Sequence, residues 1–222
     1  FYLRIEDTDA KREVEGAAEG LVKTLEHYGV HFDEGAILGD DGKIEDKGAY
    51  GPYRQSKRAE IYHVFAKRLV EEGKAYPVFT TKEELEKIKS ADKKSENSEK
   101  DWDSAAQERR EQQTRQRAIT LEEVERHLAA GDPYSLNILA DGDGEKKLKF
   151  TDLIKGTLEL PENDEDFVLL KSDGIPTYHF AHAVDDHLMG TTHVVRGEEW
   201  LPSLPKHLQL FRYLGFKPVK YM

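Results

Sequence analysis

The chain has 222 residues, of which 37% are hydrophobic and 35% charged, and its net charge is −11. This composition is typical of a soluble globular protein with one large or two small domains. No run reaches the ~18–20 apolar residues of a membrane span, and no signal peptide is recognisable. Cysteine is absent, which excludes disulfides and thiolate-bound zinc and fits a reducing cytoplasm. The acidic charge argues against general nucleic-acid binding, although a local basic stripe can still contact RNA.

The first third of the chain predicts a strand and two helices. Apolar and polar residues alternate over 1–6, which predicts a strand. Apolar residues at spacings of three and four predict an amphipathic helix from Val14 that ends at Gly29. After a loop rich in Gly and Asp, Ser56 is expected to cap a second helix that ends at Gly73.

The middle of the chain changes character. Capping boxes at 81–84 and 120–123 each predict the start of a helix. Between them, residues 90–118 are almost wholly polar and indicate a solvated helix, a mobile loop or both. Apolar residues return at 148–161 and 166–172, where short strands are predicted.

The last third of the chain predicts a strand over 192–197 and a helix over 203–215, with Pro205 near its first turn. Strand–helix units at both ends with a polar-rich α+β stretch between them predict an α/β layer interrupted by an insertion. Because the chain starts inside a predicted strand and ends at "VKYM", we interpret it as a piece of a longer protein.

Three acids follow the first predicted strand: Glu6, Asp7 and Asp9 in "RIEDTD". Glu6 lies at the strand's end, where ligand-binding groups of open α/β sheets gather. For the two aspartates a second interpretation is equally open, because Thr8 or Asp9 can cap the following helix and acids favour its positive end.

The segment 172–200 concentrates groups that are costly to bury among apolar residues. His179 and His182 are three residues apart, and Asp185 and Asp186 follow at helical spacing, a pattern that can bind zinc or another divalent metal. The alternative is that these side chains hydrogen-bond one another and the backbone to fix a tight turn.

Arg196 ends the apolar run "HVV" at the predicted carboxyl end of a strand, where a guanidinium can fork onto a carboxylate or phosphate. Its alternative is an ion pair with Glu198, Glu199 or an aspartate of "DDH". A basic stripe in the polar segment is either a phosphate contact or a solvated face, and comprises Arg109, Arg110, Arg115 and Arg117. From the residues alone, the sequence indicates an α/β site for an anion or an amino acid.

Three long motifs also carry a resemblance: "LRIEDTD" (3–9), "GPYRQSKRAEIYHVFAKRLVEEGKAYP" (51–77) and "SDGIPTYHFAHAVDDHLMGTTHVVRGEEWLPSLPKHLQLFRYLGF" (172–216). Together they resemble the bacterial-type glutamyl-tRNA synthetases, which are class I aminoacyl-tRNA synthetases. The resemblance is close over 1–82 and 148–222 and loose between these ranges.

The resemblance implies a Rossmann-type catalytic domain in two parts, 1–74 and 171–222, separated by an α+β insertion, 75–170, that binds the tRNA acceptor stem. It implies ligation of L-glutamate to glutamate tRNA through glutamyl-adenylate, with ATP and Mg²⁺, by a cytoplasmic protein expected to be a monomer. The HIGH-type and KMSKS-type motifs are expected outside the chain, so the isolated chain is expected to be inactive.

The resemblance further implies the following site residues: Glu6, Tyr178, His182 and Arg196 for glutamate, Glu199 and Trp200 for ATP, and Thr8 and Arg12 for tRNA. His182 stands where many members carry asparagine. Some relatives hold zinc with cysteines near "AYPVFTT", but Val78 and Thr80 occupy those places, so no metal site is expected. Alternatives are a glutaminyl-tRNA synthetase, a paralogue that glutamylates a tRNA base, a His/Asp metal-dependent hydrolase, and a non-catalytic RNA-binding fragment.

Overall fold

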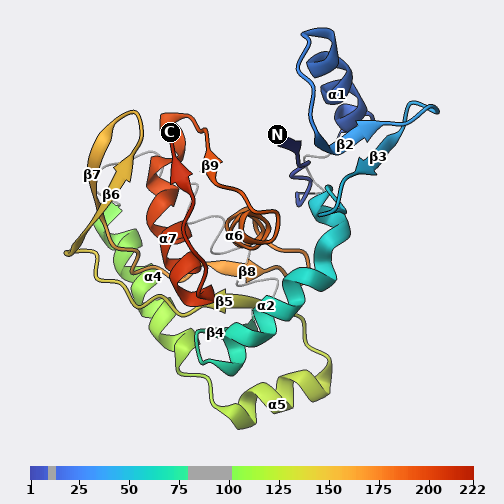
Figure 1. Cartoon of the computed structure of the whole chain (residues 1–222). Helices are drawn as coiled ribbons and strands as arrows, with labels where there is room; N and C mark the ends of the chain where they lie inside the picture. The colour runs from blue at the N-terminus through green and yellow to red at the C-terminus, as the bar shows by residue number, and fades with distance from the viewer. Residues whose placement is uncertain (10–13, 80–101) are drawn as a thin grey trace.

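The computed structural model describes residues 1–9, 14–79 and 102–222. The chain starts with a small sheet and one helix (Figure 1), formed by β1 (Tyr2–Leu3), α1 (Ala17–His27), β2 (Glu34–Leu38) and β3 (Ile44–Lys47). β1 runs parallel to β2, and β3 runs antiparallel to it. The strand predicted over 1–6 is shorter than expected. Beyond Leu3 the chain leaves β2, and Ile5 forms only an isolated bridge with Arg54.

The helix predicted after Ser56 is present, but Ser56 does not cap it. Ser56 lies inside the 3₁₀ helix η1 (Gln55–Arg58), which leads directly into α2 (Ala59–Glu71). Its hydroxyl instead donates to Asp7 Oδ2 at 2.6 Å, and its backbone N–H donates to Asp7 Oδ1 at 2.8 Å. The serine therefore serves a contact between distant segments, which no local pattern could indicate.

The middle of the chain contains two antiparallel units. One is the three-stranded sheet β4–β5–β8, built from β4 (Ala75–Phe79), β5 (Tyr134–Ile138) and β8 (Val168–Leu170). The other is a hairpin of β6 (Lys147–Asp152) and β7 (Gly156–Pro161). These pairings confirm the short strands predicted at 148–161 and 166–172.

Within the described residues between β4 and β5 there are two helices, α4 (Trp102–Arg117) and α5 (Leu121–Ala130). The capping box at 120–123 is confirmed: Thr120 Oγ1 accepts from the Glu123 N–H at 3.3 Å, and Glu123 accepts from the Thr120 N–H at 2.9 Å. The box at 81–84 and the polar residues 90–101 lie outside the described residues. The rest of the polar segment is largely helical, because α4 covers Trp102–Arg117.

The C-terminal part consists of α6 (Tyr178–Leu188), β9 (His193–Val194), the 3₁₀ helix η3 (Glu198–Ser203), α7 (Leu204–Leu214) and β10 (Lys220–Tyr221). α7 follows its prediction, with Pro205 in the first turn and Gly215 at φ 67° after the last. The strand predicted over 192–197 is short, because β9 pairs with β10 only at His193 and Val194. The tight turn considered for the histidine–aspartate segment is wrong, because that segment is helix α6.

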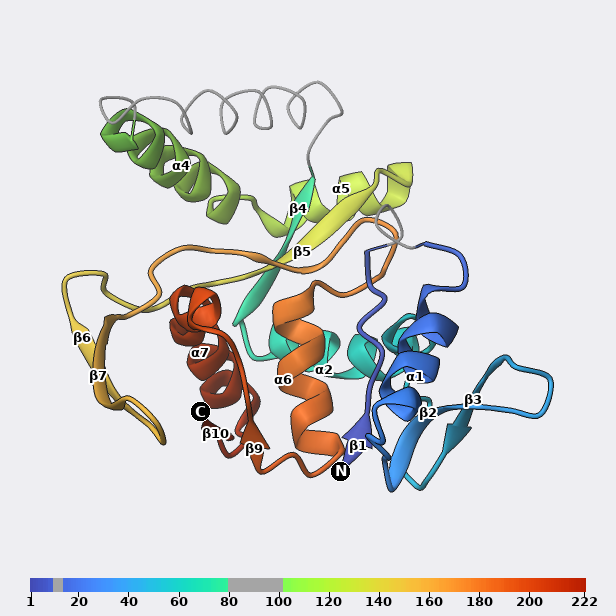
Figure 2. The ribbon, with the colours of Figure 1, turned by 90° about the horizontal axis from the view of Figure 1, so that it is seen from above.

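Three helices form a layer against the antiparallel sheet. Figure 2 shows α6 and α7 side by side with α2 behind them, and β4 and β5 of this sheet across one end of the layer. One cluster of buried residues joins these elements, including Leu69, Ile138, Leu169, Phe180 and Leu214. Full burial of side chains of this size stabilises the fold by about 1.5–3 kcal/mol each. The mixed α/β class is confirmed. Within the described residues, no helix is long and apolar enough to cross a membrane.

Candidate active site

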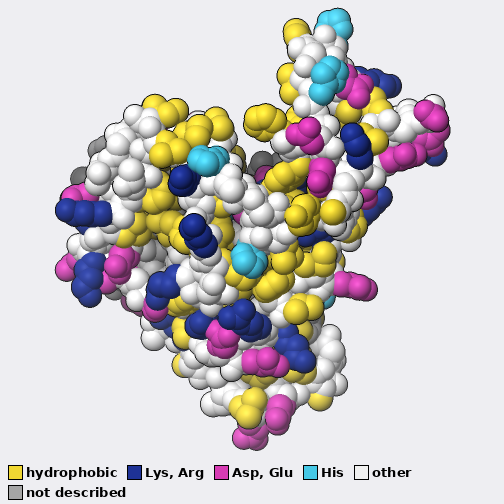
Figure 3. All heavy atoms as spheres, viewed as in Figure 1, with side chains coloured by type: hydrophobic (Ala, Val, Ile, Leu, Met, Phe, Trp, Pro, Cys, Tyr) yellow, Lys and Arg dark blue, Asp and Glu magenta, His cyan; other side chains and the backbone are white. Residues whose placement is uncertain are grey.

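A cavity of about 910 Å³ opens between β1, the α6 helix and β9. Figure 3 shows hydrophobic side chains on both sides of the notch between the C-terminal strands and the α1–β2–β3 arm. The cavity is lined by five of the residues predicted to bind substrate: Glu6, Tyr178, His182, Arg196 and Trp200. Segments almost 200 positions apart in sequence, around Glu6 and around Trp200, thus line one space.

The N-terminal strand supplies one wall through its polar face. Tyr2, Arg4 and Glu6 line the cavity together with Phe1 and Leu3, whereas Ile5 does not line it and packs with a small core around Tyr53. Every second side chain of an extended chain points to the same face, which places Tyr2, Arg4 and Glu6 on one side. Arg4 was not among the predicted site residues. Its position two residues before Glu6 on the same face was the available signal.

Arg196 forms the opposite wall. Its guanidinium donates to the Tyr178 hydroxyl and lies 5.3 Å from the centre of the Tyr178 ring and 5.7 Å from that of Trp200. Cation–π contacts of this kind hold a guanidinium in place without neutralising its charge. The backbone N–H of Arg196 donates to the Met222 carbonyl at 3.0 Å, which fixes the chain just beyond β9. The cation therefore remains available for an anionic ligand.

His182 lies between these walls and is fully buried. Its Nδ1 is 3.0 Å from Asp186 Oδ2 and 2.9 Å from Arg196 Nη2. Burial lowers the pKa of His182 well below its usual value, and the neighbouring charges of His207 and Arg196 lower it further. His182 is thus neutral near pH 7 and can accept a hydrogen bond from Arg196.

His207 of α7 belongs to the same cluster, although no sequence pattern indicated it. Its Nε2 is 3.0 Å from His179 Nδ1, and its ring centre is 4.6 Å from that of His182. Burial lowers the pKa of His179 to about 4, and it lowers the pKa of His207 to about 2. The three histidines therefore form a neutral polar floor beneath Arg196.

The acidic wall is held by a buried arginine. Arg4 Nη1 donates to Asp186 Oδ1 at 3.0 Å, and Arg4 Nη2 donates to Glu6 Oε1 at 3.1 Å. The Glu6 side chain is 37% exposed, so its carboxylate still reaches the cavity. A carboxylate on one wall and a guanidinium on the other give the cavity two poles of opposite charge.

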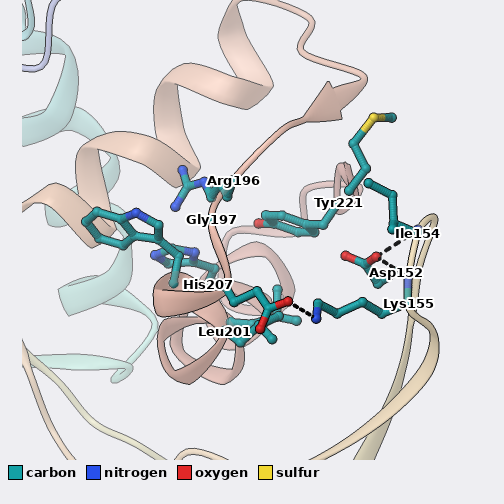
Figure 4. A pocket seen from close by; sticks show the side chains of 12 residues that line it. Asp152, Ile154, Lys155, Arg196, Gly197, Leu201, His207 and Tyr221 are labelled. Atoms are coloured by element: carbon teal, nitrogen blue, oxygen red, sulfur yellow. Dashed lines mark hydrogen bonds and ion pairs between the residues drawn. The ribbon is translucent and has the colours of Figure 1, made fainter.

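A second, smaller cavity of about 250 Å³ lies on the other side of Arg196. In Figure 4, Arg196 and His207 lie at one end and Lys155 at the other, with Tyr221 between them. Lys155 forms an ion pair with Glu198, which joins the β6–β7 turn to η3. Trp200 lines both cavities, whereas Glu199 is exposed and is not a lining residue of either.

The remaining predicted residues lie elsewhere. Thr8 is buried, and its carbonyl accepts from Lys171 Nζ at 2.7 Å. Arg12 lies outside the described residues. Neither Thr8 nor Asp9 caps α1, because its N-cap is Gly16. Asp7 accepts from Ser56 and from Arg54 Nε, so its carboxylate is used for structure.

The basic stripe is partly neutralised within the chain. Arg117 pairs with Asp166 at 2.6 Å, and Arg110 lies 3.6 Å from Asp164. Arg115 is exposed, whereas the side chain of Arg109 is not described. Arg110 and Arg117 thus each have an acidic partner within the chain, and the choice between a phosphate contact and a solvated face stays a prediction.

The alternative metal site does not form in the part of the chain that the structure describes. Asp185 accepts from Gln55 Nε2 at 3.0 Å, Arg58 Nε at 2.8 Å and Tyr62 Oη at 2.7 Å, which occupies both of its oxygens. No group of three or more His, Asp or Glu side chains in residues 1–9, 14–79 and 102–222 is arranged to hold a metal ion.

The family model for class I tRNA synthetases (E and Q), catalytic domain, matches residues 1–222. The chain therefore belongs to this family of class I tRNA synthetase catalytic domains, as the resemblance of its motifs predicted. The chain is also similar to individual members of a narrower group. These include the glutamate–tRNA ligases of Clostridium beijerinckii, 49% identical over 221 residues, and of Acetivibrio thermocellus, 49% identical over 216 residues. The chain spans 38% and 37% of the length of these two relatives.

Solved structures agree with the sequence relatives. A glutamate tRNA ligase from Elizabethkingia meningosepticum, crystallised in complex with its amino acid, superimposes with a TM-score of 0.78 at 33% identity. The match covers 100% of this chain and 41% of that one. A glutamate-tRNA synthetase from Elizabethkingia anophelis gives the same TM-score and identity.

Proposed function

We propose that the complete gene product ligates L-glutamate to tRNA through a glutamyl-adenylate. The observation that carries this proposal is the cavity with the Glu6 carboxylate on one wall and the Arg196 guanidinium on the other. L-Glutamate has the complementary charges, an ammonium group at one end and a side-chain carboxylate at the other. The family and the glutamate–tRNA ligases among its relatives support the same reaction.

In this proposal Glu6 binds the ammonium group and Arg196 binds the side-chain carboxylate, with Tyr178 closing the pocket and His182 beneath the guanidinium. Glutamine lacks the negative charge, so losing a charge-assisted hydrogen bond disfavours it by about 1.5–3 kcal/mol. The α-carboxylate then attacks the α-phosphorus of ATP and pyrophosphate leaves. A hydroxyl of the tRNA terminus attacks the resulting carbonyl and AMP leaves.

The chain's own residues contribute position and electrostatics to these steps, not a covalent intermediate. We assign Glu199 and Trp200 to the ATP side and Thr8 and Arg12 to the tRNA end. Mg²⁺ would accompany the phosphates of ATP, and none of the described residues is assigned to it. The acceptor stem would bind the insertion 75–170, between the Rossmann-type parts 1–74 and 171–222, and the enzyme would act as a cytoplasmic monomer.

The test is tRNA charging with labelled amino acids. The complete gene product should attach L-glutamate to tRNA with a kcat/KM at least about tenfold above that for L-glutamine, as a charge-assisted hydrogen bond predicts. The 222-residue chain is assayed in parallel and is expected to be inactive. A preference for glutamine would move the assignment to the glutaminyl enzymes of the same family. Absence of charging with either amino acid by the complete product would overturn the proposal.

A further inference from the structure

Within the part of the chain that the structure describes, one buried oxygen in the site lacks a hydrogen-bond donor. Asp186 Oδ2 accepts no hydrogen bond from the described residues, although the side chain is 1% exposed and Oδ2 lies 3.0 Å from His182 Nδ1. A buried carboxylate oxygen without a donor is unfavourable, more so than a neutral acceptor. The protonation of the facing imidazole nitrogen therefore decides whether this carboxylate is satisfied.

His182 Nδ1 faces two groups with opposite demands. Asp186 Oδ2 requires a donor, whereas Arg196 Nη2, at 2.9 Å, requires an acceptor. The other ring nitrogen, Nε2, lies 3.3 Å from the same Arg196 Nη2 and 3.4 Å from the Tyr221 hydroxyl. A neutral imidazole carries one N–H, so Nδ1 can meet only one of the two demands.

The two tautomers differ in what they leave unsatisfied. With the proton on Nδ1, Asp186 gains a donor and Nε2 accepts from Arg196. With the proton on Nε2, Arg196 gains a contact shorter by a few tenths of an ångström, but Asp186 Oδ2 faces a lone pair. Arg196 also has Tyr178, Trp200 and the open cavity as partners, whereas the buried oxygen of Asp186 has none. The first tautomer is therefore the more stable.

We propose that Asp186 is a positioning residue: its carboxylate holds His182 in the Nδ1–H tautomer, and His182 Nε2 thereby holds the Arg196 guanidinium at the carboxylate-binding wall. The predicted effect on glutamate binding rests on the proposed function, whereas the predicted tautomer of His182 does not. Arg4 ties the same carboxylate to Glu6, since it donates to both acids. Asp186 thus joins the two poles of the cavity through one chain of contacts.

The first measurement is the tautomer. In the complete gene product labelled with ¹⁵N-histidine, long-range ¹H–¹⁵N correlation spectra distinguish Nδ1–H from Nε2–H imidazole, and His182→Gln identifies the signal. The wild-type protein should show Nδ1–H at His182. Asp186→Asn places an amide donor against Nδ1 and should shift His182 to Nε2–H. Asp185→Asn removes the same charge one position away and should leave the tautomer unchanged.

The second measurement is the consequence for substrate. Asp186→Asn should raise KM for L-glutamate about tenfold, as loss of one hydrogen bond to a charged group predicts, with a smaller change in kcat. An Nε2–H signal at His182 in the wild type would overturn the inference, and this result needs no folded Asp186 variant. An Asp186→Asn protein with unchanged tautomer and KM would overturn it too. If the wild type charges no tRNA, the proposed function fails, while the spectra still decide the tautomer.

Discussion

Asp185 and Asp186 are neighbours on α6 and both are buried, yet their surroundings differ completely. Asp185 accepts three hydrogen bonds within 3.0 Å from Gln55, Arg58 and Tyr62, so its charge is matched by donors of η1 and α2. All three of these donor side chains are themselves buried. Its carboxylate fastens α6 to the N-terminal half of the protein.

Asp186 faces the other way. It lines the large cavity, accepts from Arg4 and from Thr191, and keeps one oxygen beside the imidazole of His182. Burial raises the pKa of its carboxyl group even though Arg4 opposes this change. A buried charge with all its hydrogen bonds made is therefore part of the framework, whereas one with an unpaired oxygen beside a cavity belongs to the site.

The largest loss of stability is expected for a substitution of Asp185, whose carboxylate belongs to the framework. Asp185→Ala leaves the Arg58 side chain, 2% exposed, without its buried partner. The free energy of unfolding should fall by about 3–5 kcal/mol, as for other broken buried ion pairs. Urea denaturation of the wild type and the variant measures the change. Glu159→Ala, which breaks the exposed pair with Lys149, is the matched control and should cost less than about 1 kcal/mol. A loss of equal size in both variants would remove the distinction drawn for Asp185.

A substitution in the candidate site should lower activity strongly and stability only slightly. Arg196→Ala removes the cation proposed to bind the substrate carboxylate, so kcat/KM for L-glutamate should fall about 100-fold or more. Unfolding free energy should change little, because Arg196 is only half-buried. Arg196→Lys keeps the charge but loses the planar fork and should recover part of the activity. Near-normal charging by Arg196→Ala would refute the role of this residue.

The buried cluster of His179, His182 and His207 predicts that the folded protein loses stability in acid. Burial holds the pKa of His179 at about 4 in the folded protein, below its usual 6.5. The unfolded chain therefore takes up protons first, so stability is fully present above about pH 6.5 and declines as the pH falls toward 4. The decline should be about 1 kcal/mol per pH unit for one such histidine.

Denaturation midpoints measured from pH 7 to pH 4 test this slope. His179→Gln should lower this slope by the contribution of one histidine and should not abolish it, because burial also lowers the pKa values of His182 and His207, which remain in the variant. A wild-type protein with equal stability at pH 6.5 and pH 4.5 would contradict the prediction.

The smallest effect concerns a helix end far from both carboxylates. Thr120→Ala removes the capping box of α5 and should lower the free energy of unfolding by about 1 kcal/mol without changing KM for glutamate. Thr114→Ala in α4 provides the contrast, since this hydroxyl donates only to the Arg110 carbonyl one turn earlier. It should be nearly neutral. If both variants lose equal stability, the cap is not the cause.

Local features of the fold were predictable because their causes lie within a few residues. The capping box at Thr120 and the limits of α7 between Pro205 and Gly215 follow from hydrogen bonds and backbone angles of adjacent positions. Strand lengths were less accessible. β1 ends where the chain leaves β2, and β9 ends where its pairing with β10 ends. The alternation of apolar and polar residues within a strand does not indicate how far a partner strand follows it.

The candidate site divides in the same way. Motifs long enough to be specific identified the family from the sequence, and with it Glu6, Tyr178 and Arg196. Folding was needed to show that Arg4 joins two acids, that His207 lies under Arg196, and that Ser56 donates to Asp7 and does not cap its own helix. The contacts of Arg4 with Asp186 and of Ser56 with Asp7 connect residues that are 182 and 49 positions apart. Their energies depend on burial and mutual distance, and both quantities exist only once the chain has folded.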